Sequence, residues 1–284
     1  MSAFQLLNGL TFAALLFIVA SGFTLIFGLL RIVNLAHGAL YLLGGLVGYS
    51  VAMWSGSFAL AAVAAMIVVA LIGVVLDQGL LRFVKGSELR QVLLTLGVAF
   101  ILNDMALVIW GGDTFTVPVP AFLQGAQQLA PGVFYPKYRL FVAGVGVLVF
   151  AGLWLLLTRT RLGALIRAGV DDAEMVDALG IDIRRVFLAS FMLGSALAGL
   201  GGVIGGAFLT LYPTADNEIL VFSLATVIIG GRGSLAGAAV GSLLVGMLNA
   251  VGQVAFPELA YFVIFGPMAL LLAFRPLGLF GKAA

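Results

Sequence analysis

The stretch QLLNGLTFAALLFIVASGFTLIFGLL, Gln5–Leu30, contains no charged residue and is long enough to cross a membrane as a helix. Crossing about 30 Å of hydrocarbon takes about 20 apolar residues at the helical rise of about 1.5 Å per residue. Inside lipid every backbone polar group needs an internal partner, so only helices or closed barrels can cross. The run is continuous rather than alternating, and it therefore predicts a transmembrane helix.

The rest of the chain repeats this pattern. The 284 residues are 63% hydrophobic and 9% charged, with a mean hydropathy of +1.22. A soluble domain carries roughly a quarter of its residues as charged side chains, so a bilayer must be the solvent for most of this chain. We therefore predict an all-α polytopic membrane protein in which residues 1–284 form one transmembrane domain of about eight or nine segments. Those segments are Gln5–Leu30, Gly38–Trp54, Phe58–Leu81, Val92–Trp110, Leu140–Leu157, Val186–Leu211, a short Ile219–Ile229, Leu235–Ala255 and Tyr261–Phe274.

Basic residues predict how these segments are oriented. The loop that holds Arg82, Lys85 and Arg90 and the loop 158–185 together carry eight of the 14 Lys and Arg. Cytoplasmic loops are enriched in basic residues, and two crossings separate these loops, so both are expected in the cytoplasm. The N-terminus and the proline-rich loop 111–138 are then expected outside, and the C-terminus inside. This predicts a multi-pass membrane protein with its N-terminus outside and its C-terminus in the cytoplasm.

The loop 158–185 contains a predicted docking helix. Asp171 or Asp172 can cap a short helix that Gly180 ends. Acidic residues and apolar residues fall on neighbouring stripes of this helix, which favours a protein partner over an anionic membrane surface. The residues expected to contact that partner are Asp172, Glu174, Met175, Val176, Asp177, Leu179 and Gly180.

Two polar breaks interrupt the apolar segments, at Arg31–Gly38 and near Gly230. Broken membrane helices commonly form transport pathways. An intramembrane carboxylate is also a candidate, because it should face protein, water or an interface. The candidates for pathway or break residues are Asn34, His37, Gly38, Asn103, Asp104, Gly230, Gly231, Gly233 and Ser234; weaker ones are Thr95, Thr210, Thr226, Asn249 and Gln253. We expect His37, the only histidine, to be a structural hydrogen bonder rather than a proton carrier.

The chain has no sequence of the form GxxxxGK[ST], no HExxH and no cysteine, and enzyme chemistry is therefore not expected. If transport is driven by ATP, another polypeptide must hydrolyse it. From the residues alone, an ion- or proton-coupled secondary transporter and a passive channel for water, urea or ammonia stay open as alternatives.

Several motifs resemble one family. They are RIVNLAHGALYLLGG at Arg31–Gly45, RLGALIRA at Arg161–Ala168, ALGID at Ala178–Asp182, VIIGGRGSLAGAAVG at Val227–Gly241 and RPLGLFG at Arg275–Gly281. In this order they resemble the permeases of branched-chain amino acid ABC importers, in the LivH branch of the LivH/LivM family, which includes urea and amide permeases.

The resemblance implies an ABC importer permease fold and no cofactor bound by this chain, with ATP on partner subunits. The implied partners are a second LivM-like permease or another copy, two cytoplasmic ATP-binding subunits and an external substrate-binding protein. The resemblance also makes the helix from Asp172 to Gly180 the coupling helix that docks on an ATPase, although Met175 and Val176 stand where other ABC permeases have alanines. The solute would be a branched-chain amino acid or a related small polar solute, with a urea, short-chain amide or aromatic-acid permease as the alternative.

Overall fold

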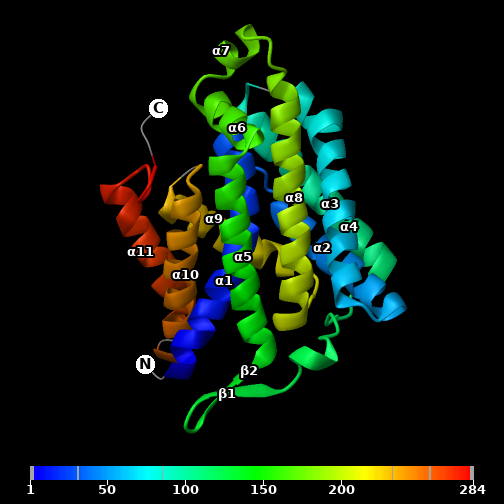
Figure 1. Cartoon of the computed structure of the whole chain (residues 1–284), viewed down its shortest axis with the longest axis vertical. Helices are drawn as coiled ribbons and strands as arrows, with labels where there is room; N and C mark the ends of the chain where they lie inside the picture. The colour runs from blue at the N-terminus through cyan, green and yellow to red at the C-terminus, as the bar shows by residue number, and fades with distance from the viewer. Residues whose placement is uncertain (1–2, 31, 85, 232, 256, 282–284) are drawn as a thin grey trace.

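The computed structural model is almost entirely helical (Figure 1), and it describes residues 3–30, 32–84, 86–231, 233–255 and 257–281. The α-helices are α1 (Ala3–Leu30), α2 (His37–Ser55), α3 (Phe58–Val74), α4 (Glu88–Trp110), α5 (Lys137–Arg159), α6 (Arg161–Asp171), α7 (Ala173–Ala178), α8 (Ile183–Phe208), α9 (Ala215–Gly230), α10 (Leu235–Ala255) and α11 (Ala260–Phe274). A π-helical turn, Val75–Leu80, and a 3-10 turn, Leu81–Phe83, extend α3, and further 3-10 turns are Ala121–Leu123 and Pro257–Leu259. Strands β1 (Ala126–Ala130) and β2 (Val133–Pro136) form an antiparallel hairpin with Gln127 opposite Tyr135.

Each of the nine predicted segments corresponds to a helix. Seven are long and apolar enough to cross a membrane, whereas α9 is shorter and acidic at its start and α11 is a shorter apolar helix. The prediction of an all-α polytopic membrane protein is therefore confirmed. Several boundaries differ from the prediction by three or four residues: the segment predicted to end at Leu211 ends at Phe208, α9 begins at Ala215 rather than Ile219, and α4 begins at Glu88 rather than Val92.

The helices run between two ends of the molecule (Figure 1). One end carries the β1–β2 hairpin and the start of α1, and the other carries α6, α7 and the connection between α3 and α4. The two basic loops therefore lie at the same end, as the sequence predicted.

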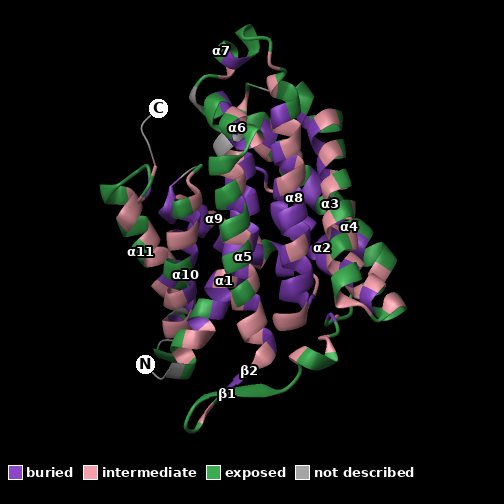
Figure 2. Ribbon diagram, in the orientation of Figure 1, coloured by how far each residue is buried: buried purple, intermediate pink, exposed green. Residues whose placement is uncertain are grey.

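Glycines bring the central helices into close contact. Figure 2 shows buried residues concentrated along α1, α2 and α8, with exposed residues on the outer sides of α4 and α5. At Gly202 of α8, an added Cβ would lie 2.0 Å from the carbonyl oxygen of Tyr41 in α2. Gly44 and Gly199 approach as closely, because a Cβ on Gly44 would lie 2.4 Å from the Cα of Gly199. Small residues allow this close van der Waals packing, which drives helix association where lipid removes the hydrophobic effect.

The connection between α8 and α9 positions the first turn of α9 inside the bundle. The backbone φ angles of Thr210 and Thr214 are 70° and 86°, values that residues other than glycine rarely adopt. Leu211 forms a bridge with Phe115 of the long loop after α4, with N···O distances of 2.7 and 2.8 Å in the two directions. These two bonds hold the strained connection in place.

Candidate coupling and translocation sites

The predicted docking helix exists as α7, at the end of the molecule opposite the hairpin (Figure 1). The Asp172 carboxylate accepts a hydrogen bond from the Met175 N–H at 2.9 Å and so caps the helix. Gly180, at φ 79°, donates its N–H to the Asp177 carbonyl oxygen at 2.9 Å and ends it. The cap and the stop are therefore where the sequence predicted them.

The faces of α7 differ from the prediction. Val176 is buried, whereas Leu179, expected on the same apolar stripe, is 71% exposed and Met175 is 58% exposed. The acidic residues Glu174 and Asp177 are also exposed. A short helix supported from one side by α6 and α8 buries a single residue, and its outward surface therefore combines two apolar and two acidic side chains.

Helix α6 was not predicted. The arginine-rich stretch before α7 forms an amphipathic helix that begins at Thr160, whose hydroxyl accepts from the Gly163 N–H at 3.1 Å. Its buried residue Ile166 packs with Val186 of α8. The loop is thus a two-helix unit, and α6 joins α7 to the transmembrane bundle.

The first break is held by hydrogen bonds within the protein. The Asn34 side-chain oxygen accepts from the Ala36 N–H at 3.1 Å, and its backbone oxygen accepts from the His37 N–H at 3.2 Å. Thr95 of α4 accepts from the Leu35 N–H at 3.1 Å. The Asn34 side chain thus accepts from a backbone N–H at the break between α1 and α2.

His37 and Gly38 begin α2 beside this break. The His37 Nε2 lies 3.0 Å from the Val19 carbonyl oxygen, and its fully buried ring meets Phe23 edge-on. At Gly38, an added Cβ would lie 2.2 Å from the Asp216 carbonyl oxygen. His37 therefore bonds as the structural interpretation expects, and Gly38 lets α2 reach the first turn of α9.

The second break follows α9. Gly231 and Gly233 adopt φ of 98° and 74°, and the Ser234 hydroxyl accepts from the Gly237 N–H at 3.0 Å. The backbone N–H of Phe280 donates to the Gly230 carbonyl oxygen at 3.0 Å. This hydrogen bond joins the break to the C-terminal segment. Arg232, between Gly231 and Gly233, lies outside the described residues.

Asn103 and Asp104 have different surroundings. The Asn103 side-chain nitrogen donates to the buried carboxylate of Asp216 at 2.7 Å, which joins α4 to α9. Asn103 and Asp216 line a small cavity of about 120 Å³. Asp104 is exposed on α4 and forms no hydrogen bond or ion pair within the described part of the chain.

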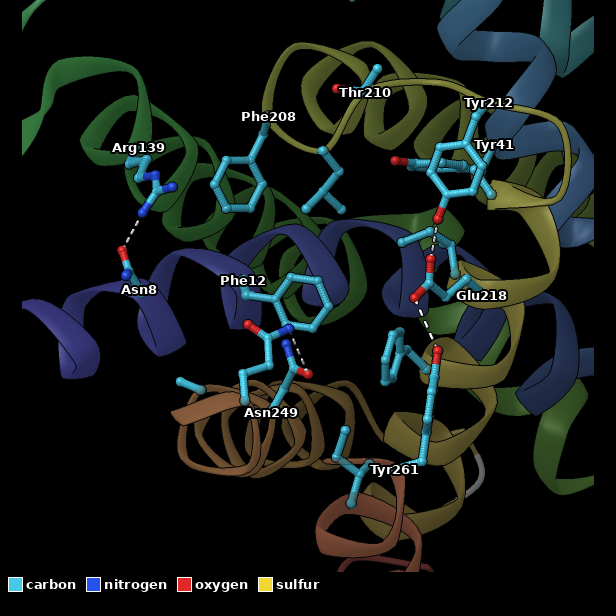
Figure 3. Close-up of a pocket in the computed structure, with 17 residues that line it drawn as sticks. Asn8, Phe12, Tyr41, Arg139, Phe208, Thr210, Tyr212, Glu218, Asn249 and Tyr261 are labelled. Atoms are coloured by element: carbon cyan, nitrogen blue, oxygen red, sulfur yellow. Dashed lines mark hydrogen bonds between the residues drawn. The ribbon is translucent and has the colours of Figure 1, made fainter. Parts of the chain in front are cut away.

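A larger cavity of about 380 Å³ lies among α1, α5, α9, α10 and α11 and the connection before α9 (Figure 3). Its charged and polar lining residues are Asn8, Tyr41, Arg139, Thr210, Tyr212, Glu218, Asn249, Gln253 and Tyr261. The Glu218 carboxylate accepts hydrogen bonds from the hydroxyl groups of Tyr212 and, at 3.2 Å, Tyr261. The Arg139 guanidinium donates to the side-chain oxygen of Asn8.

Sequence reasoning found only the edge of this cavity. Thr210, Asn249 and Gln253 were among the weaker candidates and line it, whereas none of the principal break residues does. Glu218 was missed because the predicted segment began one residue after it. A carboxylate placed directly before an apolar segment was the available signal.

The chain was compared with known proteins. The model of a family described as "Branched-chain amino acid transport system / permease component" matches residues 5–272, nearly the whole chain.

The chain belongs to this family.

The similar curated proteins are permeases along almost their full length. The high-affinity branched-chain amino acid transport system permease protein BraD of Pseudomonas aeruginosa is 28% identical over 98% of this chain and 95% of its own. The corresponding protein LivH of Escherichia coli is 25% identical over the same shares. The ribose import permease protein RbsC of Escherichia coli is 28% identical over 82% of this chain and 72% of its own. No solved structure matches the chain.

This member of the family is therefore a multi-pass membrane protein and the permease component of a transport system. The family description names a component, so other subunits complete the system. Four of the five motifs on which the resemblance rested lie within the family match, and the last, Arg275–Gly281, follows closely after it.

Proposed function

We propose that this chain is the permease subunit of an ATP-driven ABC importer for branched-chain amino acids or a related small polar solute. An external binding protein delivers the solute, and two cytoplasmic ATP-binding subunits drive its transfer. A second LivM-like permease, or another copy of this chain, completes the pathway. The chain itself holds no ATP and catalyses no reaction.

The observation that carries this proposal is the outward surface of α7. Leu179 follows directly after α7, and its N–H donates to the Met175 carbonyl oxygen at 3.1 Å as in a helical turn, so the side chains of Met175 and Leu179 project on the same side. Both are exposed at the end of the molecule, with the acidic Glu174 and Asp177 beside them. An amphipathic helix of this kind fits a groove of a partner protein. Because α6 packs on α8, a movement of α7 would have a packed route to the transmembrane helices.

The same proposal assigns the two sides of the membrane. The end that carries α7 and both basic loops is cytoplasmic, because basic loops favour that side. The hairpin and the start of α1 are then outside, and the C-terminus is cytoplasmic. The protein resides in the plasma membrane, of the bacterial inner-membrane type.

The relatives are named for different solutes, so a second class of solute is also a candidate for this chain. Two are named for branched-chain amino acids and a third for ribose, at similar identities to this chain. A urea, short-chain amide or aromatic-acid solute also suits a pathway in which the binding protein supplies the affinity.

Cross-linking tests the coupling role directly. The chain lacks cysteine, so Met175→Cys or Asp177→Cys introduces a single reactive thiol. Each variant is expected to cross-link to a co-expressed ATP-binding subunit. The control Gln128→Cys, on the exposed β1 strand at the opposite end, is expected not to. Failure at every position of α7 in a complex that imports solute would refute the coupling role.

A further inference from the structure

The 380 Å³ cavity has charges of opposite sign at its two ends. Figure 3 shows Arg139 with Asn8 at one end and Glu218 between Tyr212 and Tyr261 at the other. The size lies within the range of about 300–1,000 Å³ typical of small-molecule sites. The cavity therefore has the dimensions and the polarity of a site for a small charged or zwitterionic molecule.

Within the described part of the chain, the Glu218 carboxylate forms no ion pair. Its two hydrogen-bond donors, the hydroxyl groups of Tyr212 and Tyr261, are both neutral. The one ion pair among the described residues joins Asp182 and Arg185, far along the chain from Glu218. A carboxylate inside a membrane protein is costly unless it is paired or faces water, and such residues commonly mark a solute pathway.

The position of Glu218 in α9 explains only part of this arrangement. The positive end of the helix dipole stabilises a carboxylate in the first turn. Asp216, in the same turn, gains the same stabilisation and faces the Asn103 amide away from the large cavity. Glu218 instead lines the large cavity, where its oxygen atoms can be reached by a solute.

Aromatic rings surround the Glu218 carboxylate. The ring of Tyr261 stacks on Phe222, with centroids 6.3 Å apart and planes 13° apart, and both residues line the cavity. The faces of aromatic rings attract cations. A primary ammonium group at this end of the cavity would therefore meet a carboxylate with aromatic side chains beside it.

The other end has the opposite preference. The Arg139 guanidinium lies 5.1 Å from the centroid of the Phe208 ring and donates to Asn8, and it forms no ion pair with a described carboxylate. Phe12, which Figure 3 places between the two ends, contributes apolar surface. An α-amino acid carries its ammonium group and its carboxylate on one carbon and does not span both ends, so the Glu218 carboxylate would draw the ammonium group, and with it the solute, to its own end of the cavity.

We propose that this cavity is a binding station for α-amino acid zwitterions and that Glu218 recognises their ammonium group. The inference rests on the proposed function, because it names the solute class of the importer's own pathway. It further assigns specificity to this chain as well as to the external binding protein. Glu218 is the specificity-determining residue, and Tyr212 and Tyr261 position its carboxylate.

Alkylation of an engineered thiol in the cavity measures this binding without transport. In the assembled importer, Gln253→Cys places a thiol on the cavity wall, where a hydrophilic maleimide reacts with it. L-leucine and 3-methylbutan-1-amine are expected to slow the reaction, because both carry the ammonium group. The keto acid 4-methyl-2-oxopentanoate, which lacks it, is expected to need at least about tenfold higher concentration, as hydrogen bonds to a charged group would give.

Substitution of Glu218 separates its charge from its structural bonds. Glu218→Gln keeps an oxygen that accepts from a tyrosine but removes the charge, so the concentration of L-leucine that protects should rise about tenfold. Glu218→Asp retains the charge and should retain the preference for the amine over the keto acid. Glu88→Gln makes the same replacement of a carboxylate by an amide at an exposed position outside the cavity, and it should leave the protecting concentration of L-leucine unchanged.

Several results would overturn the inference. The keto acid and L-leucine could protect the thiol equally, or neither L-leucine nor the amine could protect it. A Glu218→Gln variant that elutes as the intact complex could also show unchanged protection. These results leave the cross-link between α7 and the ATP-binding subunit unaffected. Conversely, amine protection that depends on Glu218 in a chain whose α7 never cross-links would refute the coupling role and retain the ammonium site.

Discussion

Substitution of Gly202 by alanine should loosen the packing of α8 against α2. The new Cβ would lie 2.0 Å from the Tyr41 carbonyl oxygen and 2.5 Å from the Gly45 nitrogen. Both neighbours are backbone atoms, so α2 must move by more than 1 Å before an ordinary contact of at least 3.4 Å is restored. Such overpacking costs about 1–3 kcal/mol, and the absence of a flexible neighbour puts Gly202 at the upper end. Alanine regains about 1 kcal/mol of helix propensity, which leaves a net loss of roughly 2 kcal/mol.

Gly97 offers a matched control within the same chain. It lies in α4, and an added Cβ would meet nothing within 4 Å, so Gly97→Ala gains helix propensity without a clash. Thermal unfolding followed by size-exclusion chromatography in mild detergent measures both variants. Gly202→Ala should melt roughly 4–8 °C below the unmodified protein, and Gly97→Ala should melt at or slightly above it. A Gly202→Ala protein as stable as Gly97→Ala would show that α8 and α2 are not packed backbone to backbone.

Three further substitutions test separate contacts. Asn103→Leu removes the donor to the buried Asp216 carboxylate and should destabilise the protein by about 1–3 kcal/mol in the same melting assay; an unchanged melting temperature would contradict this. Thr95→Val removes the acceptor for the Leu35 N–H, so hydrogen exchange at Leu35 should accelerate roughly fivefold, as loss of about 1 kcal/mol implies; unchanged exchange would mean that Thr95 does not hold the break. Met175→Asp places a charge on the exposed apolar surface of α7, and co-purification of the ATP-binding subunit should fall about tenfold or more, since burying a methionine contributes about 1.5–3 kcal/mol; full co-purification would place the contact elsewhere.

The sequence predicted the transmembrane architecture because the bilayer imposes a simple rule on composition. A run such as Phe58–Leu81 has to be a helix, because lipid allows only helices and closed barrels, and barrel strands alternate apolar and polar residues. The caps of α7 were also predictable, because Asp172 and Gly180 act on residues three or four positions away. Local chemistry and the solvent together determine these features.

Features built from distant segments were not predictable. The partner of Asn103 lies on α9, and Arg139 and Glu218 line one cavity although α5 and α9 are far apart in the chain. Periodicity within one segment carries no information about such contacts. Helix α6 was missed for a different reason. Its arginines are typical of an irregular charged loop, and its apolar side is buried only because it packs on α8.

Reconstitution into vesicles tests the central claim, that an external motor drives this permease through α7. The full importer, with its binding protein outside and ATP in the compartment that holds the ATP-binding subunits, should accumulate L-leucine or the native solute above equilibrium. The chain without those subunits should accumulate nothing. Accumulation above equilibrium by this chain alone would contradict the account, because it would require an energy source within the chain itself.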